Sequence, residues 1–169
     1  MRLVAFLALA IASCTTQIFA DEWISYGHDP GGTKHSPLKQ IHAGNVAGLQ
    51  IVWTYRTGDL YLPKGGGRPS SQQTTPIYVD GTLYVTSAFG RVIALDPETG
   101  KPRWSFDPKS DISAGWGDFA NRGAATWLDS KRKSGEPCRR RIFVATIDAR
   151  LLRWTGEPVK SAVTLVARE

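Results

Sequence analysis

The stretch "RVIALDPETGKPRWSFDP", from Arg91 to Pro108, is typical of two short β-strands joined by a tight turn. The turn is "DPETG", in which the proline ring presets the backbone of the first central position. Asp96 can accept hydrogen bonds from backbone N–H groups inside the turn, and Gly100 supplies a conformation that other residues resist. The second strand carries Trp104, whose large ring is suited to packing against a neighbouring structural unit.

Two further strands precede this pair. We expect four antiparallel strands in all, at Thr75–Val79, Thr82–Ser87, Arg91–Leu95 and Pro102–Phe106. Asp80 and Gly81 form the first hairpin turn, of the kind that needs positive φ angles. Four short strands connected by tight turns make a meander, which is one blade of a β-propeller. A blade alone cannot bury both of its faces, so such units occur in sets.

The composition agrees with an all-β protein of moderate size. The 169 residues include 17 Gly, 10 Pro and 6 Trp, a mixture of turn formers and aromatic residues that suits many short strands. The formal net charge is +6, and much of the excess lies in "KRKSGEPCRRR", residues 131–141. Gly135 and Pro137 interrupt this run and no aromatic residue interleaves with it, so we expect a solvated loop and no nucleic-acid partner.

The N-terminus is typical of a secretory signal peptide. A single Arg precedes an apolar run from Leu3 to Ala12, which is too short to span a bilayer. We favour cleavage after Ala20. The alternative is a lipoprotein box, "IASC", which would lipidate Cys14 and attach the chain to a membrane. Either route exports the protein, and removal of Cys14 leaves Cys138 without a partner in an oxidising compartment.

The organisation expected from these patterns has five parts. Residues 45–59 include an alternating run at Gln50–Thr57 that predicts a strand, and residues 61–73 have the composition of a loop. The expected parts are a signal peptide (1–20), an N-terminal loop with the first propeller strand (21–74), a complete blade (75–108), part of a second blade (109–152) and a tail (153–169).

The segment "ALDPETGKPRW" resembles the tryptophan-docking repeat of bacterial quinoproteins. These are periplasmic dehydrogenases that use pyrroloquinoline quinone (PQQ) and are built as eight-bladed propellers. "WISYGHDPGGTKHSPLKQI", "TTPIYVDGTLYV" and "NRGAATW" are similar, in this order, to the opening of the membrane glucose dehydrogenase type and its soluble relatives. The likeness runs from about Trp23 to Leu152. It implies a partial propeller, with one four-stranded blade and part of a second, from a periplasmic enzyme that oxidises an alcohol or an aldose sugar.

The resemblance also implies three contacts with PQQ. Arg122 in "NRG" matches an arginine that contacts the quinone, and its guanidinium suits a carboxylate or quinone oxygen. Gln73 precedes "TTP", where the family often has Glu or Gln, although a shift by one residue would bring Gln72 to this place. Thr146 in "ATIDARL" is the third expected contact. His28 and His35 lie near no metal-ligand spacing, and we expect them to form hydrogen bonds within their loop.

In the family, the calcium ligands, the aspartate that acts as general base and the aromatic floor under the quinone lie in later blades. The resemblance therefore implies PQQ and calcium as cofactors, an incomplete site in these residues and no activity of this chain alone. The resemblance implies an electron acceptor that is a quinone or a cytochrome, and the residues do not distinguish the two. The alternative is a non-catalytic propeller scaffold or sensor module, which would share the structural repeat. The opening segment "WISYGHDPGG" and Arg122 favour the enzyme, because a scaffold has no reason to keep them.

The C-terminal segment departs from the family pattern. After "ATIDARLL" the family continues with Ala-Leu-Asp and then Thr-Gly-Lys, whereas this chain has "RWTGEPVKSAVTLVARE". If one base is missing before the codon for Arg153, allowed codons for this stretch encode Ala-Leu-Asp-Gly-Gly-Thr-Gly-Lys in the restored frame. We therefore expect residues 153–169 to be a frameshifted tail, the alternative being an ordinary divergent tail. The restored frame also contains a cysteine that could pair with Cys138, and the nucleotide sequence of the gene tests this interpretation.

Overall fold

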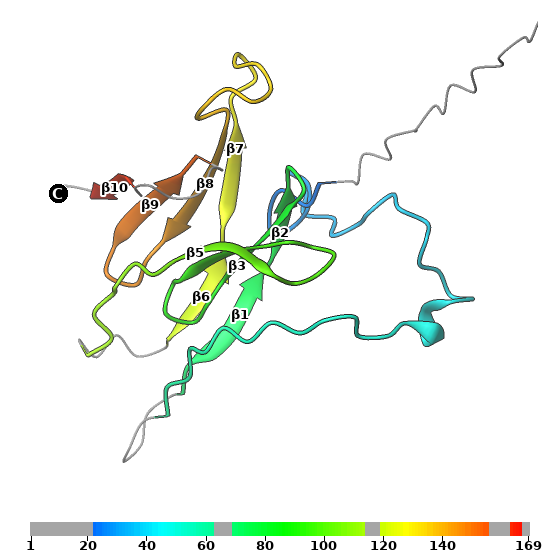
Figure 1. Cartoon of the computed structure of the whole chain (residues 1–169), viewed down its shortest axis with the longest axis horizontal. Helices are drawn as coiled ribbons and strands as arrows, with labels where there is room; N and C mark the ends of the chain where they lie inside the picture. Colours follow the sequence, from blue (N-terminus) through cyan, green and yellow to red (C-terminus); the bar gives the residue numbers. More distant parts are fainter. Residues whose placement is uncertain (1–21, 63–68, 114–118, 156–162, 167–169) are drawn as a thin grey trace, which may run out of the picture.

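The computed structural model describes residues 22–62, 69–113 and 119–155, together with the backbone of residues 163–166. These residues form ten β-strands and one short 3-10 helix, η1 (Val46–Gly48), so the described part is all-β (Figure 1). Two sheets have four strands each, and a third is a parallel pair. No helix in the described segments is long and apolar enough to cross a membrane. The expected signal peptide lies outside the described residues.

The first sheet is the blade expected from the turn pattern. Its strands pair in chain order and are all antiparallel: β2 (Ile77–Val79), β3 (Thr82–Thr86), β4 (Val92–Leu95) and β5 (Pro102–Phe106). β4 is apolar throughout and is buried along its whole length. The strand expected at Thr75–Val79 is divided at Pro76, because proline has no N–H group to donate to a ladder. The residues before Pro76 belong to a separate strand, β1 (Ser71–Thr75).

The "DPETG" turn is held by the contacts that its sequence implies. The Asp96 carboxylate accepts hydrogen bonds from the backbone N–H groups of Glu98 (3.2 Å) and Thr99 (2.9 Å). Its other oxygen pairs with the Arg103 guanidinium at 3.0 Å. Gly100 has a φ angle of +67°, in the left-handed region that favours glycine. The turn therefore fixes the relative position of β4 and β5, as expected.

The second sheet also has four strands. They are β7 (Ala125–Leu128), β8 (Arg140–Ala145), β9 (Arg150–Trp154) and β10 (Val163–Val166), again paired antiparallel in chain order. We expected only part of a second blade, ending at residue 152. The structure differs because β9 continues to Trp154, and β10 supplies the fourth strand from within residues 153–169. The frameshift origin of that segment stays a prediction.

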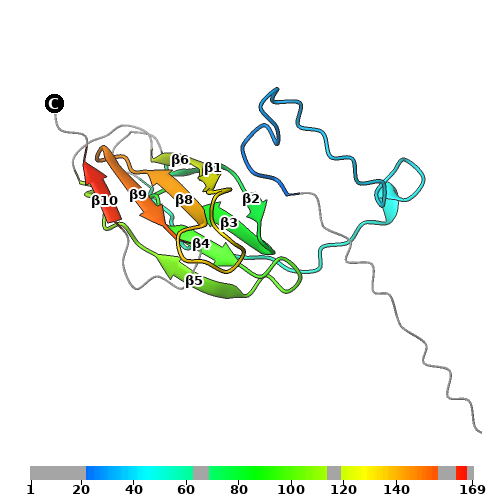
Figure 2. The same ribbon diagram turned by 90° about the horizontal axis from the view of Figure 1, so that it is seen from above.

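The core lies between the two sheets, which stand side by side in both views (Figures 1 and 2). It is formed by nine buried residues: Ile77, Val79, Tyr84, Val92, Ala94, Ile142, Val144, Leu152 and Trp154. Trp104 from β5 packs against this cluster and stacks on Trp154, with ring centroids 6.4 Å apart. Trp104 therefore joins its blade to the next, as expected, and the fold is a partial β-propeller.

The segment 50–57 differs from its expectation. It has no strand partner in the part of the chain that the structure describes, and Ile51 and Val52 are 87% and 85% exposed. Its anchor is Trp53, whose indole N–H donates to the carbonyl oxygen of Pro97 at 3.0 Å. The indole ring also lies on Gly100, where an added Cβ atom would be 2.4 Å from Cδ2 of the ring. A tryptophan thus docks this segment on the first blade without backbone pairing.

Most of the basic run, but not its end, lies in the loop expected for it. Residues 129–139 connect β7 to β8 as a turn-rich loop, and most of them are exposed. The last two arginines of the run belong to β8 instead, and the Arg141 guanidinium lies 4.6 Å from the centroid of the Trp127 ring. Cys138, at the end of this loop, is a free cysteine in the described residues.

Candidate cofactor-binding site

The two sheets meet at a short parallel pair formed by β1 and β6 (Ala120–Gly123). Each of these strands leads into the first strand of its own sheet, β1 into β2 and β6 into β7 (Figure 1). Gly123 makes this approach possible: its φ angle is +127°, and an added Cβ atom would lie 2.9 Å from the carbonyl oxygen of Thr75. Only glycine fits these two conditions, which explains the glycine of "NRG".

Successive side chains of a strand point to opposite faces, and this divides the residues of the pair. Gln72 and Asn121 lie opposite each other in register and point toward the sheets. The Gln72 amide donates to the carbonyl oxygen of Thr86 at 2.8 Å, and the Asn121 amide donates to that of Ala145 at 3.1 Å. Their amides are therefore engaged within the fold.

Gln73 and Arg122 follow these residues by one position, on the other face of the pair. Both side chains are exposed. The Gln73 amide donates to the Ser71 hydroxyl at 3.2 Å, which is a contact within β1. Gln73 and Arg122 thus lie on adjacent strands with exposed side chains, and their contact with a cofactor stays a prediction.

Thr146, the third predicted residue, lies elsewhere. It follows β8 directly, is 7% exposed and belongs to the turn before β9. Its hydroxyl donates to the Asp148 carboxylate and accepts from the backbone N–H of Arg150 at 3.1 Å. Thr146 lies near Asn121, because a Cβ atom added to Gly90 would be 3.9 Å from each of these two side chains. Successive side chains of β6 point to opposite faces, so Thr146 lies on the side away from Arg122. Its hydroxyl serves the turn, and its contact with a cofactor stays a prediction.

The N-terminal loop adds a second cation near Arg122. The Lys34 ammonium donates to the Tyr26 hydroxyl at 2.8 Å and lies 4.3 Å from the centroid of its ring. The hydrogen bond and charge of Lys34, with a smaller contribution from Arg122, lower the pKa of Tyr26. Lys34 has no signal in the sequence, because no local pattern connects "TKHS" with "NRG". The described residues hold no group of three or more His, Cys, Asp or Glu side chains arranged for a metal ion.

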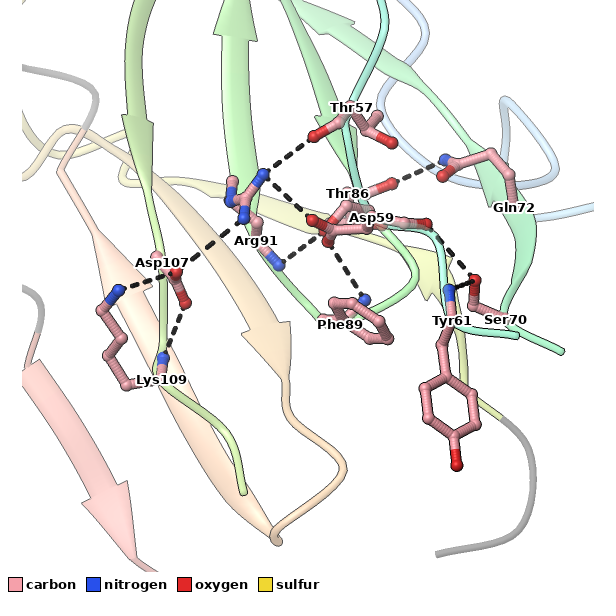
Figure 3. A network of polar contacts seen from close by, with 11 residues as sticks. Thr57, Asp59, Tyr61, Ser70, Gln72, Thr86, Phe89, Arg91, Asp107 and Lys109 are labelled. Atoms are coloured by element: carbon pink, nitrogen blue, oxygen red, sulfur yellow. Dashed lines mark hydrogen bonds and ion pairs between the residues drawn. The ribbon is translucent and has the colours of Figure 1, made fainter. Parts of the chain in front are cut away.

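A buried ion pair supports the start of β1 (Figure 3). The Asp59 side chain is only 2% exposed and pairs with the Arg91 guanidinium at 3.0 Å. Asp59 also accepts from the backbone N–H of Phe89 (3.4 Å), and its carbonyl oxygen accepts from the Ser70 hydroxyl (3.3 Å). Ser70 immediately precedes β1, so this pair fixes the segment that leads to Gln73. No sequence pattern marked Asp59, because its partner is distant in the chain.

The arrangement suits an anionic ligand with carboxylate or carbonyl oxygens. Arg122 offers a planar fork of N–H donors, and Gln73 offers an amide that can donate or accept. Both project from a backbone that is fixed by the parallel pair and by the amide contacts of Gln72 and Asn121. PQQ carries three carboxylates and two adjacent quinone oxygens. The residues present therefore fit one edge of this cofactor.

Comparison with known proteins identifies the family of this chain. Residues 23–161 match the family described as PQQ: Glucose/ethanol/alcohol dehydrogenase, beta-propeller domain. Quinoprotein glucose dehydrogenase A of Acinetobacter calcoaceticus is 36% identical over 161 residues, covering 89% of this chain and 20% of that protein. The 1-butanol dehydrogenase (cytochrome c) of Thauera butanivorans is 35% identical over 170 residues, covering 96% of this chain and 22% of the relative.

A similar fold occurs in a solved structure. The quinohemoprotein alcohol dehydrogenase of Pseudomonas putida HK5 superposes with a TM-score of 0.66 at 33% identity, over 85% of this chain and 19% of that protein. The chain thus spans about a fifth of the length of the relatives that it matches. Because the family match covers most of the 169 residues, the chain belongs to the PQQ-dependent glucose, ethanol and alcohol dehydrogenases and forms part of their β-propeller domain.

Proposed function

We propose that this chain supplies one sector of a PQQ-dependent dehydrogenase that oxidises the CH–OH group of an alcohol or an aldose sugar. The observation that carries the proposal is the placement of Gln73 and Arg122 on two hydrogen-bonded strands, β1 and β6. Two polar residues identified from separate sequence motifs project from the same face, on adjacent strands that open consecutive blades. Each of them directly follows one of the two residues, Gln72 and Asn121, that lie opposite each other in the parallel pair.

Arg122 and Gln73 bind and orient the cofactor in this proposal. The Arg122 fork donates to a carboxylate or quinone oxygen, and the Gln73 amide donates to a second oxygen on the same edge. Lys34 increases the positive potential near Arg122 and favours an anionic ligand. Thr146 is a further proposed contact, provided that its hydroxyl turns from Asp148 toward the ligand. When bound, PQQ supplies the acceptor for the two electrons removed from the substrate.

The remaining chemistry is assigned by family resemblance. It places the calcium ligands and the aspartate base in other blades, so we propose that the 169 residues alone do not turn over substrate. Electrons pass to a quinone or to a cytochrome, and similarity to the 1-butanol dehydrogenase (cytochrome c) of Thauera butanivorans supports a cytochrome. The apolar run at Leu3–Ala12 supports export to the periplasm.

Titration of PQQ into the purified chain, followed by tryptophan fluorescence, tests the proposal. We expect saturable quenching, with affinity reduced roughly 10- to 100-fold by Arg122→Ala and about 2- to 10-fold by Gln73→Ala. Arg132→Ala removes the same charge from the basic loop and should leave the affinity unchanged. Equal weakening by Arg132→Ala would show non-specific attraction to a basic protein, and an absence of binding would favour the scaffold or sensor. With PQQ and calcium added, dye reduction by glucose or simple alcohols should stay at background.

A further inference from the structure

The turn between β3 and β4 has a distinctive set of contacts. The backbone N–H of Ser87 donates to the carbonyl oxygen of Arg91 at 2.9 Å, and the Arg91 N–H donates to the Ser87 hydroxyl at 3.0 Å. Gly90, just before Arg91, has a φ angle of +79°. The hydroxyl and the left-handed residue together close a five-residue turn.

The turn between β8 and β9 repeats this set at the same spacing. The Thr146 N–H donates to the carbonyl oxygen of Arg150 at 2.9 Å, and the Arg150 N–H donates to the Thr146 hydroxyl at 3.1 Å. Ala149 takes the place of Gly90 and also has a positive φ angle, +60°. Few alanines adopt this conformation, so its presence shows that the second turn preserves the geometry of the first.

The arginine of each turn reaches back to the chain before its blade. The Arg91 guanidinium donates to the carbonyl oxygen of Thr57 at 2.8 Å, and that of Arg150 donates to the carbonyl oxygen of Pro108 at 2.8 Å (Figure 3 for Arg91). Each acceptor lies four residues after a tryptophan. Trp53 precedes Thr57 and docks on the blade of Arg91, and Trp104 precedes Pro108 and stacks on Trp154 in the blade of Arg150. Each arginine therefore clasps its turn to the segment that leads into its blade.

A carboxylate completes each clasp, although it comes from a different place. Arg91 pairs with Asp59 of the leading segment at 3.0 Å, whereas Arg150 pairs with Asp148 of its own turn at 2.7 Å. Arg91 also lies 3.8 Å from a second carboxylate, that of Asp107, so the two clasps differ in charge. The carbonyl contact is the part that fixes the turn against the preceding segment.

The same two turns hold the strands of the parallel pair. Thr86, which precedes Ser87, accepts the Gln72 amide, and Ala145, which precedes Thr146, accepts the Asn121 amide. A continuous series of contacts thus runs in each blade from the leading carbonyl, through the arginine and its turn, to β1 or β6. The next residue along these strands is Gln73 in one blade and Arg122 in the other.

We propose that Arg91 and Arg150 are positioning residues for PQQ, with Arg91 acting through Gln73 and Arg150 acting through Arg122. The proposal rests on the proposed function for the ligand role of Gln73 and Arg122. It assigns each arginine to the strand at the end of its own series, and the two series also meet, because Arg91 lies 3.8 Å from Asp107, next to Pro108. Gln73 and Arg122 thereby occupy equivalent positions in consecutive blades, which accounts for their shared face.

Lysine substitutions test the clasps with least damage to the fold. Arg91→Lys keeps a positive charge for Asp59, which would otherwise be a buried unpaired carboxylate, but it cannot bind carbonyl and carboxylate with one planar fork. Arg150→Lys is the equivalent change in the second blade. Arg103→Lys is the matched control, because Arg103 also pairs with an aspartate (Asp96, 3.0 Å) but belongs to neither clasp.

Backbone hydrogen exchange of the full chain without PQQ gives the first readout. Arg91→Lys should accelerate exchange in residues 71–75 at least roughly threefold, and more than in residues 120–123, which are paired with them. Arg150→Lys should give the reverse pattern, and Arg103→Lys should change neither strand. Equal acceleration of both strands, or of neither, would overturn the proposal, whether or not the protein binds PQQ.

PQQ titration of combined variants gives the second readout. Arg91→Lys should weaken binding roughly threefold or more in the wild-type and Arg122→Ala backgrounds, and have no further effect once Gln73→Ala is present. Arg150→Lys should show the opposite dependence. The same loss in both backgrounds would indicate general destabilisation and overturn the assignment. If the wild-type chain does not bind PQQ, the proposed function fails, while the exchange experiment still decides whether the clasps fix the strands.

Discussion

Trp104 of the first sheet stacks on Trp154 of the second, with ring centroids 6.4 Å apart and ring planes inclined by 29°. Phe106 meets the edge of the same Trp154 ring, at a centroid separation of 5.2 Å. Trp154 is 1% exposed, and its indole N–H has no hydrogen-bond partner within the described part of the chain. The ring therefore contributes packing between the blades, while its polar group is buried at a cost.

These opposing effects predict different results for two substitutions of Trp154. Trp154→Phe removes the buried N–H group and keeps an aromatic ring, so we expect the free energy of unfolding to be unchanged or raised by about 1 kcal/mol. Trp154→Ala removes the ring and should lower that free energy by about 3–5 kcal/mol. Urea unfolding followed by circular dichroism measures both. Trp127→Ala, at a 46% exposed position, is the control and should cost much less. Equal losses from Phe and Ala would show that the N–H group is not a liability.

The blade and its turns could be predicted because local chemistry determines them. "DPETG" contains the acceptor, the proline and the left-handed glycine of its own turn, and Asp96 makes the contacts that this implies. No strand forms at Gln50–Thr57, although one was expected there. A strand needs a neighbouring strand to pair with, and the alternation of side chains in the sequence does not show whether one is present.

The candidate site was predictable in part for the same reason. Gln73 and Arg122 belong to short motifs, so resemblance to the family could predict them as cofactor contacts, and that role stays a prediction. The supporting ion pair of Asp59 and Arg91 joins residues far apart in the chain and has no local signal. For Thr146, the motif predicted a cofactor contact but not the hydrogen bond from its hydroxyl to Asp148. That hydrogen bond depends on the folded turn.

Gly123 provides a direct test of the parallel pair. Gly123→Ala would place a Cβ atom 2.9 Å from the Thr75 carbonyl oxygen at a φ angle of +127°. We expect β1 and β6 to separate, with a loss of about 1–3 kcal/mol in the free energy of unfolding. Amide chemical shifts of residues 71–75 should report the change. Gly48→Ala, where an added Cβ atom meets nothing within 4 Å, is the control. Unchanged shifts in β1 would contradict the close approach.

Arg140 joins the second sheet to two acidic residues from earlier in the chain. Its side chain is 10% exposed and pairs with Glu22 at 2.7 Å and with Asp80 at 2.9 Å. Arg140→Ala should lower the free energy of unfolding by about 1–3 kcal/mol, because two charge-assisted hydrogen bonds are lost while both carboxylates can still be solvated. The free energy of unfolding of Arg140→Lys should lie between those of the wild type and Arg140→Ala, because an ammonium cannot match both carboxylates at once. Chemical denaturation measures these differences, and a loss from Arg139→Ala as large as that from Arg140→Ala would refute the specific role.

The final prediction concerns the acid stability of the first blade. Hydrogen bonds from Arg103 and from the backbone and hydroxyl of Thr99 lower the pKa of Asp96 from 3.8 to about 2. A carboxyl group with a lower pKa in the folded state stabilises that state at any pH above its unfolded pKa. This contribution is lost as the pH falls through the folded pKa. Asp96 should therefore contribute to stability above about pH 4 and lose this contribution between pH 4 and 2.

Asp96→Asn should remove that part of the pH dependence. Above pH 5 we expect the variant to be less stable than the wild type by a constant amount, because asparagine offers the turn one uncharged acceptor and cannot pair with Arg103. Between pH 4 and 2 the two free energies of unfolding should converge as Asp96 becomes protonated in the wild type. Urea unfolding at stepped pH measures this convergence, and Glu98→Gln in the same turn should keep the wild-type slope. Parallel curves for the wild type and Asp96→Asn through this interval would show that the turn carboxylate does not link folding to protonation.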